Sequence, residues 1–484
     1  MSAVYDLRSA LDTLRNNPGE LIETDRLVSP NLEIAGIYKK LSAGGSVMRP
    51  TKTGPALVFN NVDGFPGVRV AIGVMGNRKR VGLLMDTPPE RLGFLYKEAA
   101  DNMLSPVVVD NKEALCQEVV YRADEPGFDI RKIIPASKTT EIDAGGYITM
   151  GLCYAQDPET GEGNLAIHRM CLQSEDETTI GFGGYRHMNV FREKANRAGK
   201  PLPISINVGA DPSIYISSCF QPPVTQLGCD ELAVAGAIRK QPVELVKCLT
   251  IDCNAIANAE FVIEGELYPD TKATEDQHSG TGYSLPEFLG YMGGVRHQPV
   301  IKIKAVTCRK NPIWQMCVAP SEEHVNMEGI PLEAMILQAT ERAMPGKVLN
   351  VYGMPAGGGK LVAAIQFKKT DETDEGRQKQ AGLVAFGVCP ELKNVFVVDE
   401  DIDIFDTHEI MWAFTTRFKP EMDLSYITGV RCHRSDPTQK LYYDSSLRSV
   451  GIGTKAIYDC TVPFDAKEHF VRAKFMDVDI SEFE

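Results

Sequence analysis

Short apolar runs separated by Gly, Pro and Asp clusters predict a β-rich region in the middle of the chain. The runs with strand-like composition cover residues 147–150, 165–172, 204–208, 214–217, 261–263 and 300–306. Short strands with turn residues between them are typical of a β-barrel or a sandwich. Two stretches with helical periodicity, 189–198 and 231–240, interrupt this pattern. We therefore expect a split β-barrel-like domain over residues 116–320.

Both flanking regions mix strands with helices. Residues 1–115 hold strand-like runs at 56–60 and 68–72 and a helical stretch at 89–103, which predict an N-terminal α/β domain. After residue 325 the pattern predicts strands at 348–352, 361–367 and 394–398 and helices at 375–386 and 407–418. Such alternation favours a C-terminal α/β domain over residues 325–484 with a mainly parallel layered sheet.

Proline, glycine and capping residues predict where some elements begin and end. Pro331 is expected to open a helix that the Met-Pro-Gly segment 344–346 closes, because proline suits a first turn and Pro-Gly follows helix ends. Asp406 or Thr407 is expected to cap the helix at 407–418. Linkers between the three domains are expected near residues 110–125 and 318–330.

Composition and charge narrow the class of protein. The 484-residue chain has 51 Lys and Arg against 65 Asp and Glu, and this net charge of −14 argues against nucleic acid as a partner. No apolar run reaches the length of a membrane span and the N-terminus lacks an apolar signal segment, so we expect a cytoplasmic protein with no membrane partner. The twelve cysteines are scattered without CxxC pairs, which favours buried reduced thiols.

Two polar segments near the C-terminus match known ligand motifs only in part. The run Gly357-Gly358-Gly359-Lys360 lacks the spacing of a phosphate-binding P-loop and the Ser or Thr after its lysine, so a nucleotide triphosphatase is not expected. The acidic run 399–406 could form a metal cage, but it lies between a predicted strand and a predicted helix. Solvated loop acids with a helix cap are the favoured interpretation.

One mixed set of polar residues in the β-rich region is more informative. Asn164 starts a predicted strand, His187 follows a Gly-Gly-Tyr-Arg segment, and Glu231 begins a predicted helix. An amide oxygen, an imidazole and a carboxylate suit Mn²⁺ or Mg²⁺ and are poor ligands for thiophilic metals. By residue type alone, His187 could equally be a hydrogen-bond donor in a loop. These residue types by themselves therefore do not decide whether a metal site is present.

Several longer strings, in order along essentially the whole chain, resemble the UbiD family of decarboxylases. They are Asn164-x-x-Ile167-x-Arg169-Met, His187 before a helix, residues 203–212, Glu231-x-x-x-Ala-Gly-Ala-Ile-Arg, Glu260-x-Val-Ile-Glu264-Gly and residues 397–405. Within the family the resemblance is closest to the gallate and protocatechuate (3,4-dihydroxybenzoate) decarboxylases, through residues 38–51, 320–325 and 355–361. The resemblance implies a non-oxidative carboxy-lyase that uses prenylated FMN.

Carried over by position, the resemblance implies a cofactor and metal site. Asn164, His187 and Glu231 would bind a Mn²⁺ ion that also holds the flavin phosphate. A K⁺ ion would lie near the backbone carbonyls of residues 217–220, with Glu231 shared between the two ions. The residues that would line the flavin or bind its phosphate are Ile167, His168, Arg169, Arg186 and Lys393. A dianionic phosphate needs such cations in a chain of charge −14.

The resemblance also implies a proton donor. Glu287 matches the family's donating acid and Arg169 would pair with it; arginine stabilises the carboxylate while burial opposes it, which can place the pKa near neutral. The chain departs from the family at Gly282, where a second acid is usual, so a Glu–Arg–Glu relay stays open. Asn164 and Arg169 face opposite ways on a flat strand, so a shared cleft requires a bulge, a strand end or a cofactor that wraps the edge.

His324 and Lys360 are the expected substrate ligands, and His433 is a third candidate. By residue type alone His324 and Lys360 would be loop and turn residues, but the resemblance implies that they hold ring hydroxyls. The implied reaction is reversible decarboxylation of 3,4-dihydroxybenzoate or gallate, with Glu287 protonating the ring carbon. The alternatives are a heteroaromatic acid such as furoate or pyrrole carboxylate, and a flavin- or metal-binding protein without turnover. The implied partners are a flavin prenyltransferase and further copies of the chain, in a dimer or hexamer.

Overall fold

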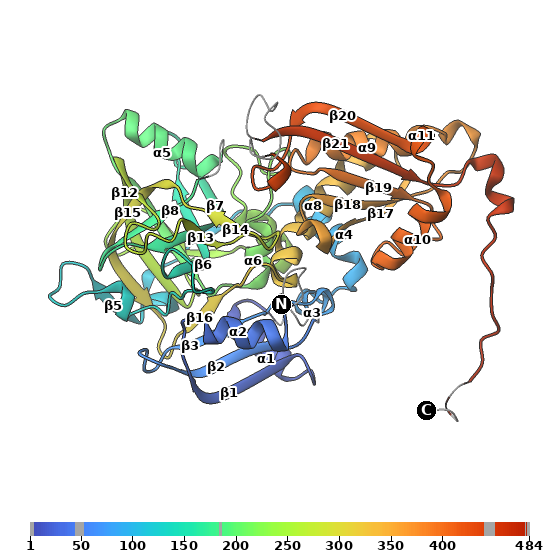
Figure 1. Cartoon of the computed structure of the whole chain (residues 1–484). Coiled ribbons are helices and arrows are strands. Elements are labelled where there is room, and N and C mark those ends of the chain that lie inside the picture. Colours follow the sequence, from blue (N-terminus) through green and yellow to red (C-terminus); the bar gives the residue numbers. More distant parts are fainter. Residues whose placement is uncertain (1–3, 44–52, 183–185, 440–450, 480, 482–484) are drawn as a thin grey trace.

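The computed structural model describes residues 4–43, 53–182, 186–439, 451–479 and 481, and its elements are labelled in Figure 1. Near the N-terminus, a four-stranded sheet has the order β1-β2-β3-β16. Its strands are β1 (Leu21–Val28), β2 (Ala56–Val62), β3 (Arg69–Ile72) and β16 (Ile313–Met316). The helices of this region are α1 (Leu7–Arg15), α2 (Glu33–Leu41), α3 (Arg78–Leu84) and α4 (Leu92–Asp101). Because β16 comes from the far end of the β-rich region, the two regions share one sheet.

The central region forms an antiparallel sheet that closes on itself, as the alternating apolar runs predict. Its strand order is β12-β9-β6-β7-β8-β15-β5, and β12 also pairs with β15, so that six strands form a barrel with β5 outside it. The strands are β5 (Val119–Arg122), β6 (Tyr147–Gln156), β7 (Gly163–Leu172), β8 (Glu177–Ile180), β9 (Leu202–Val208), β12 (Phe261–Thr274) and β15 (His297–Cys308). Side chains such as Ile204, Ile206 and Ile263 fill the core at alternate positions.

Helices and short strands surround this barrel. They are α5 (His187–Arg197), α6 (Pro212–Ser217), α7 (Leu232–Arg239), the small sheet of β4 (Val107–Val108), β10 (Glu244–Lys247) and β11 (Asn254–Ile256), and the pair β13 (Tyr283–Pro286) and β14 (Met292–Gly294). The prediction of a strand at 214–217 is wrong, because these residues belong to α6. The side chain of Asp211 accepts a hydrogen bond from Ser213 N, and Pro212 occupies the first helical position, so the capping residues outweigh the β-propensity of Ile-Tyr-Ile.

The C-terminal region is a five-stranded sheet with helices, but it is mixed rather than mainly parallel. The order is β17-β18-β19-β21-β20; the two central pairs are parallel and the two edge pairs are antiparallel. The strands are β17 (Val348–Gly353), β18 (Val362–Phe367), β19 (Asn394–Val398), β20 (Leu424–Arg431) and β21 (Ile452–Cys460), and the helices are α8 (Glu322–Ala343), α9 (Arg377–Val388), α10 (Thr407–Arg417) and α11 (Pro420–Asp423). Asp406 caps α10, as predicted.

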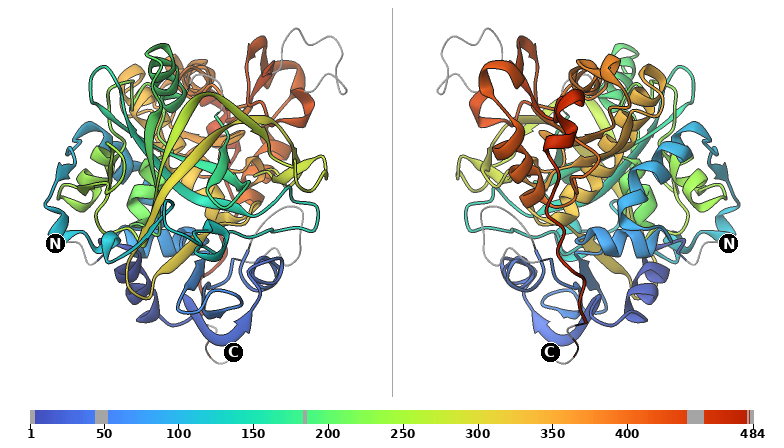
Figure 2. Two further views of the ribbon diagram at one scale, coloured as in Figure 1. Left: turned by 90° about the vertical axis from the view of Figure 1, so that its left-hand side faces the viewer. Right: turned by 90° about the vertical axis from the view of Figure 1, so that its right-hand side faces the viewer.

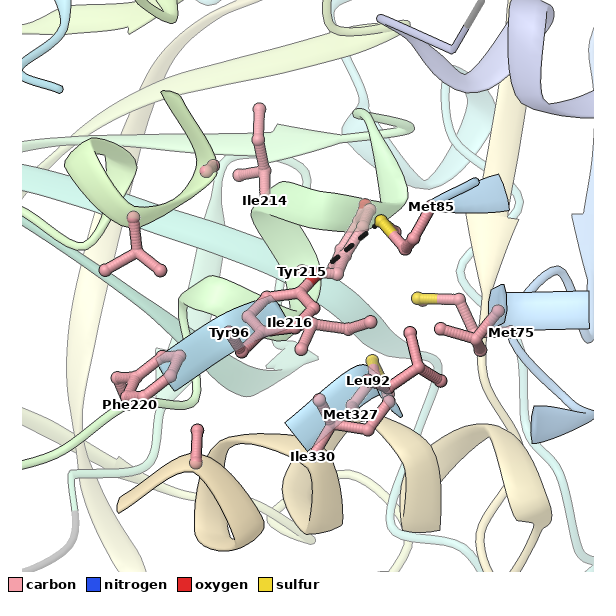
Figure 3. Close-up of a cluster of buried hydrophobic side chains, with 14 of the residues drawn as sticks. Met75, Met85, Leu92, Tyr96, Ile214, Tyr215, Ile216, Phe220, Met327 and Ile330 are labelled. Atoms are coloured by element: carbon pink, nitrogen blue, oxygen red, sulfur yellow. Dashed lines mark hydrogen bonds between the residues drawn. The ribbon is translucent and has the colours of Figure 1, made fainter. Parts of the chain in front are cut away.

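Helix α8 joins the three regions, and it begins nine residues before the predicted start at Pro331. The side chain of Ser321 accepts a hydrogen bond from His324 N and caps the helix, so Pro331 lies inside it and residues 322–330 form its first turns rather than a linker. α8 packs against α4, α6, β17 and α9 (Figure 1). Figure 3 shows the buried cluster at this junction, where Tyr96 of α4 and Tyr215 of α6 lie near Met327 and Ile330 of α8. This shared core holds the barrel and the C-terminal sheet on either side of one helix.

The cysteines and the helices of the described residues test two of the expectations drawn from the sequence. All twelve cysteines are free, and none is more than partly exposed, which confirms the prediction of reduced thiols. Among the described residues, no helix combines the length and the apolar character that crossing a membrane requires.

Candidate active site

The site is built on one edge of strand β7. β7 pairs with β6 along its whole length, but with β8 only at Met170, Cys171 and Leu172, so its other edge from Gly163 to Arg169 faces a cavity. β6 is bulged opposite Arg169, because Ile148 pairs with Met170 and Gly151 with His168. The open edge allows side chains from both faces of β7 to line cavities: Asn164 lines one, Arg169 lines an adjoining one, and Ala166 lines both. This arrangement answers the geometric question that Asn164 and Arg169 raised.

Two adjoining cavities meet along this edge. One has a volume of about 310 Å³ and is lined by Ile167, His168, Arg169, Glu287, Phe288, His324, Glu328 and Lys360, among others. The other has a volume of about 530 Å³ and is lined by Asn164, His187, Glu231, Glu391, Arg431, His433 and Arg434, among others. Ala166, Arg186 and Gln221 line both. Volumes of this size suit a cofactor and a small ligand.

Asn164, His187 and Glu231 lie together in the larger cavity. Asn164 Nδ2 is 2.8 Å from Glu231 Oε2 and 3.4 Å from His187 Nδ1, and Leu165 N donates to Glu231 Oε2 at 2.9 Å. His187 is the first residue of α5 and Glu231 immediately precedes α7, so two helix starts and a strand edge position the three side chains.

The charge state of this cluster suits a hard divalent cation. Burial raises the pKa of Glu231 to about 8, and the negative charge of the neighbouring Asp230 acts in the same direction. Burial, and then the charge of Arg186, lowers the pKa of His187 and keeps its imidazole neutral. A buried carboxylate, a neutral imidazole and an amide match the ligands that Mn²⁺ takes, and the cation would supply the missing positive charge. Among the described residues no three His, Cys, Asp or Glu side chains cluster in this way, so the amide of Asn164 is needed to complete the set.

Arg169, which lines the smaller cavity, lies between two glutamates, Glu287 in the cavity lining and the buried Glu275. Arg169 Nη1 is 2.5 Å from Glu287 Oε1, and Arg169 Nε is 3.9 Å from Oε1 of the buried Glu275. Tyr147 donates to Glu275 at 3.3 Å, and Glu287 occupies the turn between β13 and β14. Glu275 therefore supplies a second acid beside Arg169, although Gly282 occupies the position where the sequence comparison expected one. Glu275 directly follows strand β12, and nothing in the local sequence indicates its approach to Arg169.

The two carboxyl groups beside Arg169 differ in their pKa values. Burial raises the pKa of Glu287, but the charge of Arg169 and its hydrogen bond outweigh burial, so the net pKa lies below its usual value. The near-neutral pKa expected for Glu287 is therefore not found. Burial also raises the pKa of Glu275, and there Arg169 only partly offsets it, so the net pKa is raised. Arg169 lies between an ionised carboxylate and a carboxyl group that holds its proton more tightly.

Phe288, next to Glu287, brings the expected substrate ligands together. His324 stacks on its ring with centroids 5.6 Å apart, His433 meets its edge at 4.9 Å, and Lys360 Nζ lies 5.5 Å from the ring centre. Lys360 also forms a 2.8 Å ion pair with Glu328. The sequence analysis missed both Phe288 and Glu328. Glu328 lies one helical turn after His324 on α8, and this spacing becomes informative only when the helix is known to start at Glu322.

The glycine run 357–359 has a packing role that a phosphate loop would not have. Gly358 has φ +63°, and a Cβ there would lie 2.3 Å from Phe288 Cδ2, so only glycine allows the ring to approach. The acidic run 399–406 is likewise structural: Asp399 and Asp401 pair with Arg417 at 2.9 and 2.6 Å, and Asp406 caps α10. The structure thus agrees that residues 357–360 are not a phosphate loop and that the acidic run caps a helix. Asp399, however, is buried rather than solvated, because Arg417 compensates its charge.

The remaining predicted residues divide into two groups. Ile167, His168 and Arg186 line the cavities, and burial lowers the pKa of His168 to about 4. Lys393 lines neither cavity, because its Nζ lies 2.7 Å from Asp436 and 2.8 Å from Thr438 Oγ1. Arg431 and Arg434 line the larger cavity instead. Residues 44–51, which contributed to the resemblance, and residues 183–185, which precede Arg186 and His187, lie outside the described residues.

The fold and the site together define a multidomain α/β enzyme with a barrel-like domain whose cavity holds a candidate cation cluster beside an acid–arginine pair. The family models for 3-octaprenyl-4-hydroxybenzoate carboxy-lyase match this chain in three parts: the N-terminal domain at residues 12–98, the Rift-related domain at 107–322 and the C-terminal domain at 325–460. The chain belongs to the UbiD family and is a carboxy-lyase of that family.

Individual relatives cover nearly the whole chain. Gallate decarboxylase of Lactiplantibacillus plantarum is 47% identical over 98% of this chain and 97% of its own length. The apo 3,4-dihydroxybenzoic acid decarboxylase of Enterobacter cloacae is 48% identical, covers 99% of each chain and superimposes with a TM-score of 0.94. The UbiD-class enzyme HmfF of Pelotomaculum thermopropionicum, in complex with FMN, is 31% identical over 99% of each chain with a TM-score of 0.85.

Proposed function

We propose that this enzyme reversibly decarboxylates an aromatic acid with neighbouring ring hydroxyls, 3,4-dihydroxybenzoate or gallate, with the help of prenylated FMN. The observation that carries the proposal is the smaller cavity, where the Glu287–Arg169 pair faces the same space as His324 and Lys360. One side of the cavity offers a proton donor and the other offers polar groups for ring hydroxyls. The two relatives of 47% and 48% identity act on acids of this type.

The residues of the larger cavity fit a flavin phosphate with its cations. Asn164, His187 and Glu231 would hold Mn²⁺, and Arg186 lies where it can face both cavities. Residues 218–220 line the cavities close by, which supports a K⁺ ion near their carbonyls. A homologous structure at 30% identity contains the prenylated flavin. When bound, this flavin supplies the electron sink for loss of CO₂.

The protein's own residues would orient the ring and move the proton. Lys360 and His324 would hold the hydroxyls at one end of the ring, with His433 beside Phe288 as a third contact. Glu287 would then deliver a proton to the ring carbon that has lost CO₂, and Arg169 would hold the resulting carboxylate. Because Glu287 is ionised at rest, a proton must reach it before donation, and Glu275 on the other side of Arg169 would store one.

The test is a CO₂-release screen with the protein produced alongside a flavin prenyltransferase and supplied with Mn²⁺ and K⁺. We expect turnover of 3,4-dihydroxybenzoate or gallate, with exchange of labelled bicarbonate into the acid in the reverse direction. Preference for furoate or pyrrole carboxylate would replace the proposed substrate class. No CO₂ from any acid, with flavin and metal fully bound, would favour a binding protein without turnover.

We also propose that the chain forms a homo-oligomer through its C-terminal region. After Phe470 the chain leaves the body as an extended arm (Figures 1 and 2), on which Val471, Phe475 and Met476 are 81%, 91% and 85% exposed. Apolar side chains exposed to this degree on one segment are typical of an interaction surface. Sedimentation should show an oligomer for the full chain and a smaller species for a chain ending at residue 470; an unchanged mass would remove the arm from the interface.

A further inference from the structure

We propose that Glu328 is a specificity-determining residue, which accepts a hydrogen bond from one of two neighbouring ring hydroxyls of the substrate while Lys360 donates to the other. This inference rests on the proposed function, and it adds a carboxylate to a set of substrate ligands that otherwise consists of two imidazoles and an ammonium group. It explains how the cavity would prefer an acid with two adjacent hydroxyls over an acid with one.

The position of Glu328 places it in the substrate cavity. It lies four residues after His324 on α8, so both side chains leave the same face of the helix. Glu328, His324, Lys360 and Glu287 all line the 310 Å³ cavity. The side chains of Glu328 and Lys360 are only 17% and 13% exposed, so water competes weakly for their hydrogen bonds.

The pairing of Glu328 leaves it able to accept from a ligand. Lys360 Nζ lies 2.8 Å from Oε1 of Glu328, and among the described residues no side-chain or backbone donor forms a hydrogen bond to Oε2. Glu287, the other carboxylate, is the proposed proton donor, and its Oε1 is held by Arg169 at 2.5 Å. Glu328 is therefore the carboxylate of the cavity that can accept a hydrogen bond from the ring without taking part in proton transfer.

The chemistry of a vicinal diol needs such an acceptor. Each phenolic hydroxyl brings a proton that must be donated, and a lysine ammonium group can only donate. Lys360 can serve the oxygen of one hydroxyl, but the protons require acceptors, and a carboxylate forms a stronger hydrogen bond than a neutral group. A Glu328–Lys360 pair offers one acceptor and one donor side by side, which matches two adjacent hydroxyls better than a single hydroxyl or an unsubstituted ring.

The competing explanation is that Glu328 only holds the charge of Lys360 in place. Glu391 provides the matched control, because its Oε2 lies 3.9 Å from Lys360 Nζ while the residue lines the larger cavity instead of the 310 Å³ one. Replacing either acid by glutamine removes a negative charge near Lys360, but only Glu328→Gln replaces the charged acceptor of the substrate cavity by a neutral amide, which is a weaker acceptor.

The experiment compares the wild type, Glu328→Gln and Glu391→Gln in two measurements. The first is the ratio of kcat/KM for 3,4-dihydroxybenzoate over 4-hydroxybenzoate, and the second is the ratio of the Kd of phenol to the Kd of catechol, measured by calorimetry. For Glu328→Gln we expect both ratios to fall by about 10- to 100-fold, the range for a hydrogen bond to a charged group. For Glu391→Gln we expect both ratios to stay within about twofold of the wild type, even if activity on both acids declines.

Unchanged ratios in Glu328→Gln, or an equal fall in Glu391→Gln, would overturn the proposal. If Glu328→Gln does not fold, Glu328→Asp keeps the charge beside Lys360 and withdraws the acceptor by one methylene, and the same fall in both ratios is expected. If the wild type releases no CO₂ from any acid, the proposed function fails. The calorimetric ratio then still decides whether Glu328 selects a vicinal diol.

Discussion

Glu231, which is buried, and Glu287, which is half-buried, line adjoining cavities and have opposite electrostatic environments. Burial disfavours the charge of both, but only Glu287 has an arginine within 2.5 Å, so its pKa is lowered while that of Glu231 rises to about 8. The arginine therefore reverses the effect that burial has on the pKa of Glu287. The charge of Glu287 is compensated by Arg169, a side chain of the protein, whereas the charge of Glu231 would be compensated by a bound metal ion. This difference distinguishes the proposed proton-transfer site from the proposed metal site.

The largest effect is expected at the cation site. Glu231→Ala should lose metal and flavin together, because the ligand that carries the charge is removed. Outer-shell partners of metal ligands already contribute 10- to 100-fold in affinity, so metal affinity should fall by at least about 100-fold. Metal analysis and the flavin absorbance of purified protein measure this. Glu162→Ala, which removes an exposed acid two residues before Asn164, is the control, and a full flavin spectrum in Glu231→Ala would contradict the assignment.

The second-largest effect is expected at Glu287, where a substitution should reduce turnover without releasing metal or flavin as Glu231→Ala does. Glu287→Gln should keep metal and flavin, because Glu287 is not in the cation cluster, but turnover should fall by about 100- to 10,000-fold, the range for loss of a general acid. Single-turnover measurements with loaded protein would show it. Near-normal turnover would assign proton donation to another group.

Removing the arginine should make Glu287 resemble Glu231. Arg169 lowers the pKa of Glu287 against the effect of burial, so Arg169→Gln should raise that pKa and keep the acid protonated to higher pH. The limb of the pH profile that belongs to Glu287 should move upward by roughly one to three pH units. The profile of kcat/KM measures this, and the double variant with Glu287→Gln should lack the limb. If this limb of the pH profile does not move in Arg169→Gln, Arg169 is not what lowers the pKa of Glu287.

The smallest effect is expected at Glu275. Glu275→Gln keeps the size of the side chain but removes the carboxyl group whose raised pKa would store a proton, so turnover should fall by about tenfold, an amount that corresponds to one hydrogen bond. Metal and flavin content should not change. A loss as large as that of Glu287→Gln would make Glu275 an equal partner in proton transfer, and no loss would remove it from the relay.

The parts of the fold that follow local patterns could be predicted from the sequence, and the parts that depend on distant contacts could not. Most barrel strands contain a short apolar run bounded by turn residues, so their existence was visible, whereas β5 and β8 were not predicted. The start of α8 was not, because Ser321 caps the helix ten residues before a proline that would ordinarily mark the first turn. The edge strands of the C-terminal sheet run antiparallel, which alternation along the chain cannot reveal.

The candidate site shows the same division. Asn164, His187 and Glu231 come together as the resemblance implied, because each lies at the start or edge of an element that the sequence marks. Glu275 lies 106 positions after Arg169 in the chain, and Lys393 forms an ion pair with Asp436 instead of lining a cavity. No pattern in the neighbouring sequence predicts either contact. Phe288 and Glu328 were missed because their roles depend on the contact between the barrel and the C-terminal region.

The most direct test of the comparison is an anomalous diffraction measurement at the manganese edge on crystals of the flavin-loaded protein. The account predicts one strong peak within bonding distance of Asn164, His187 and Glu231, and no peak beside Arg169 and Glu287. A peak elsewhere, such as at Asp399 and Asp401, or full flavin occupancy with no peak in the larger cavity, would contradict it.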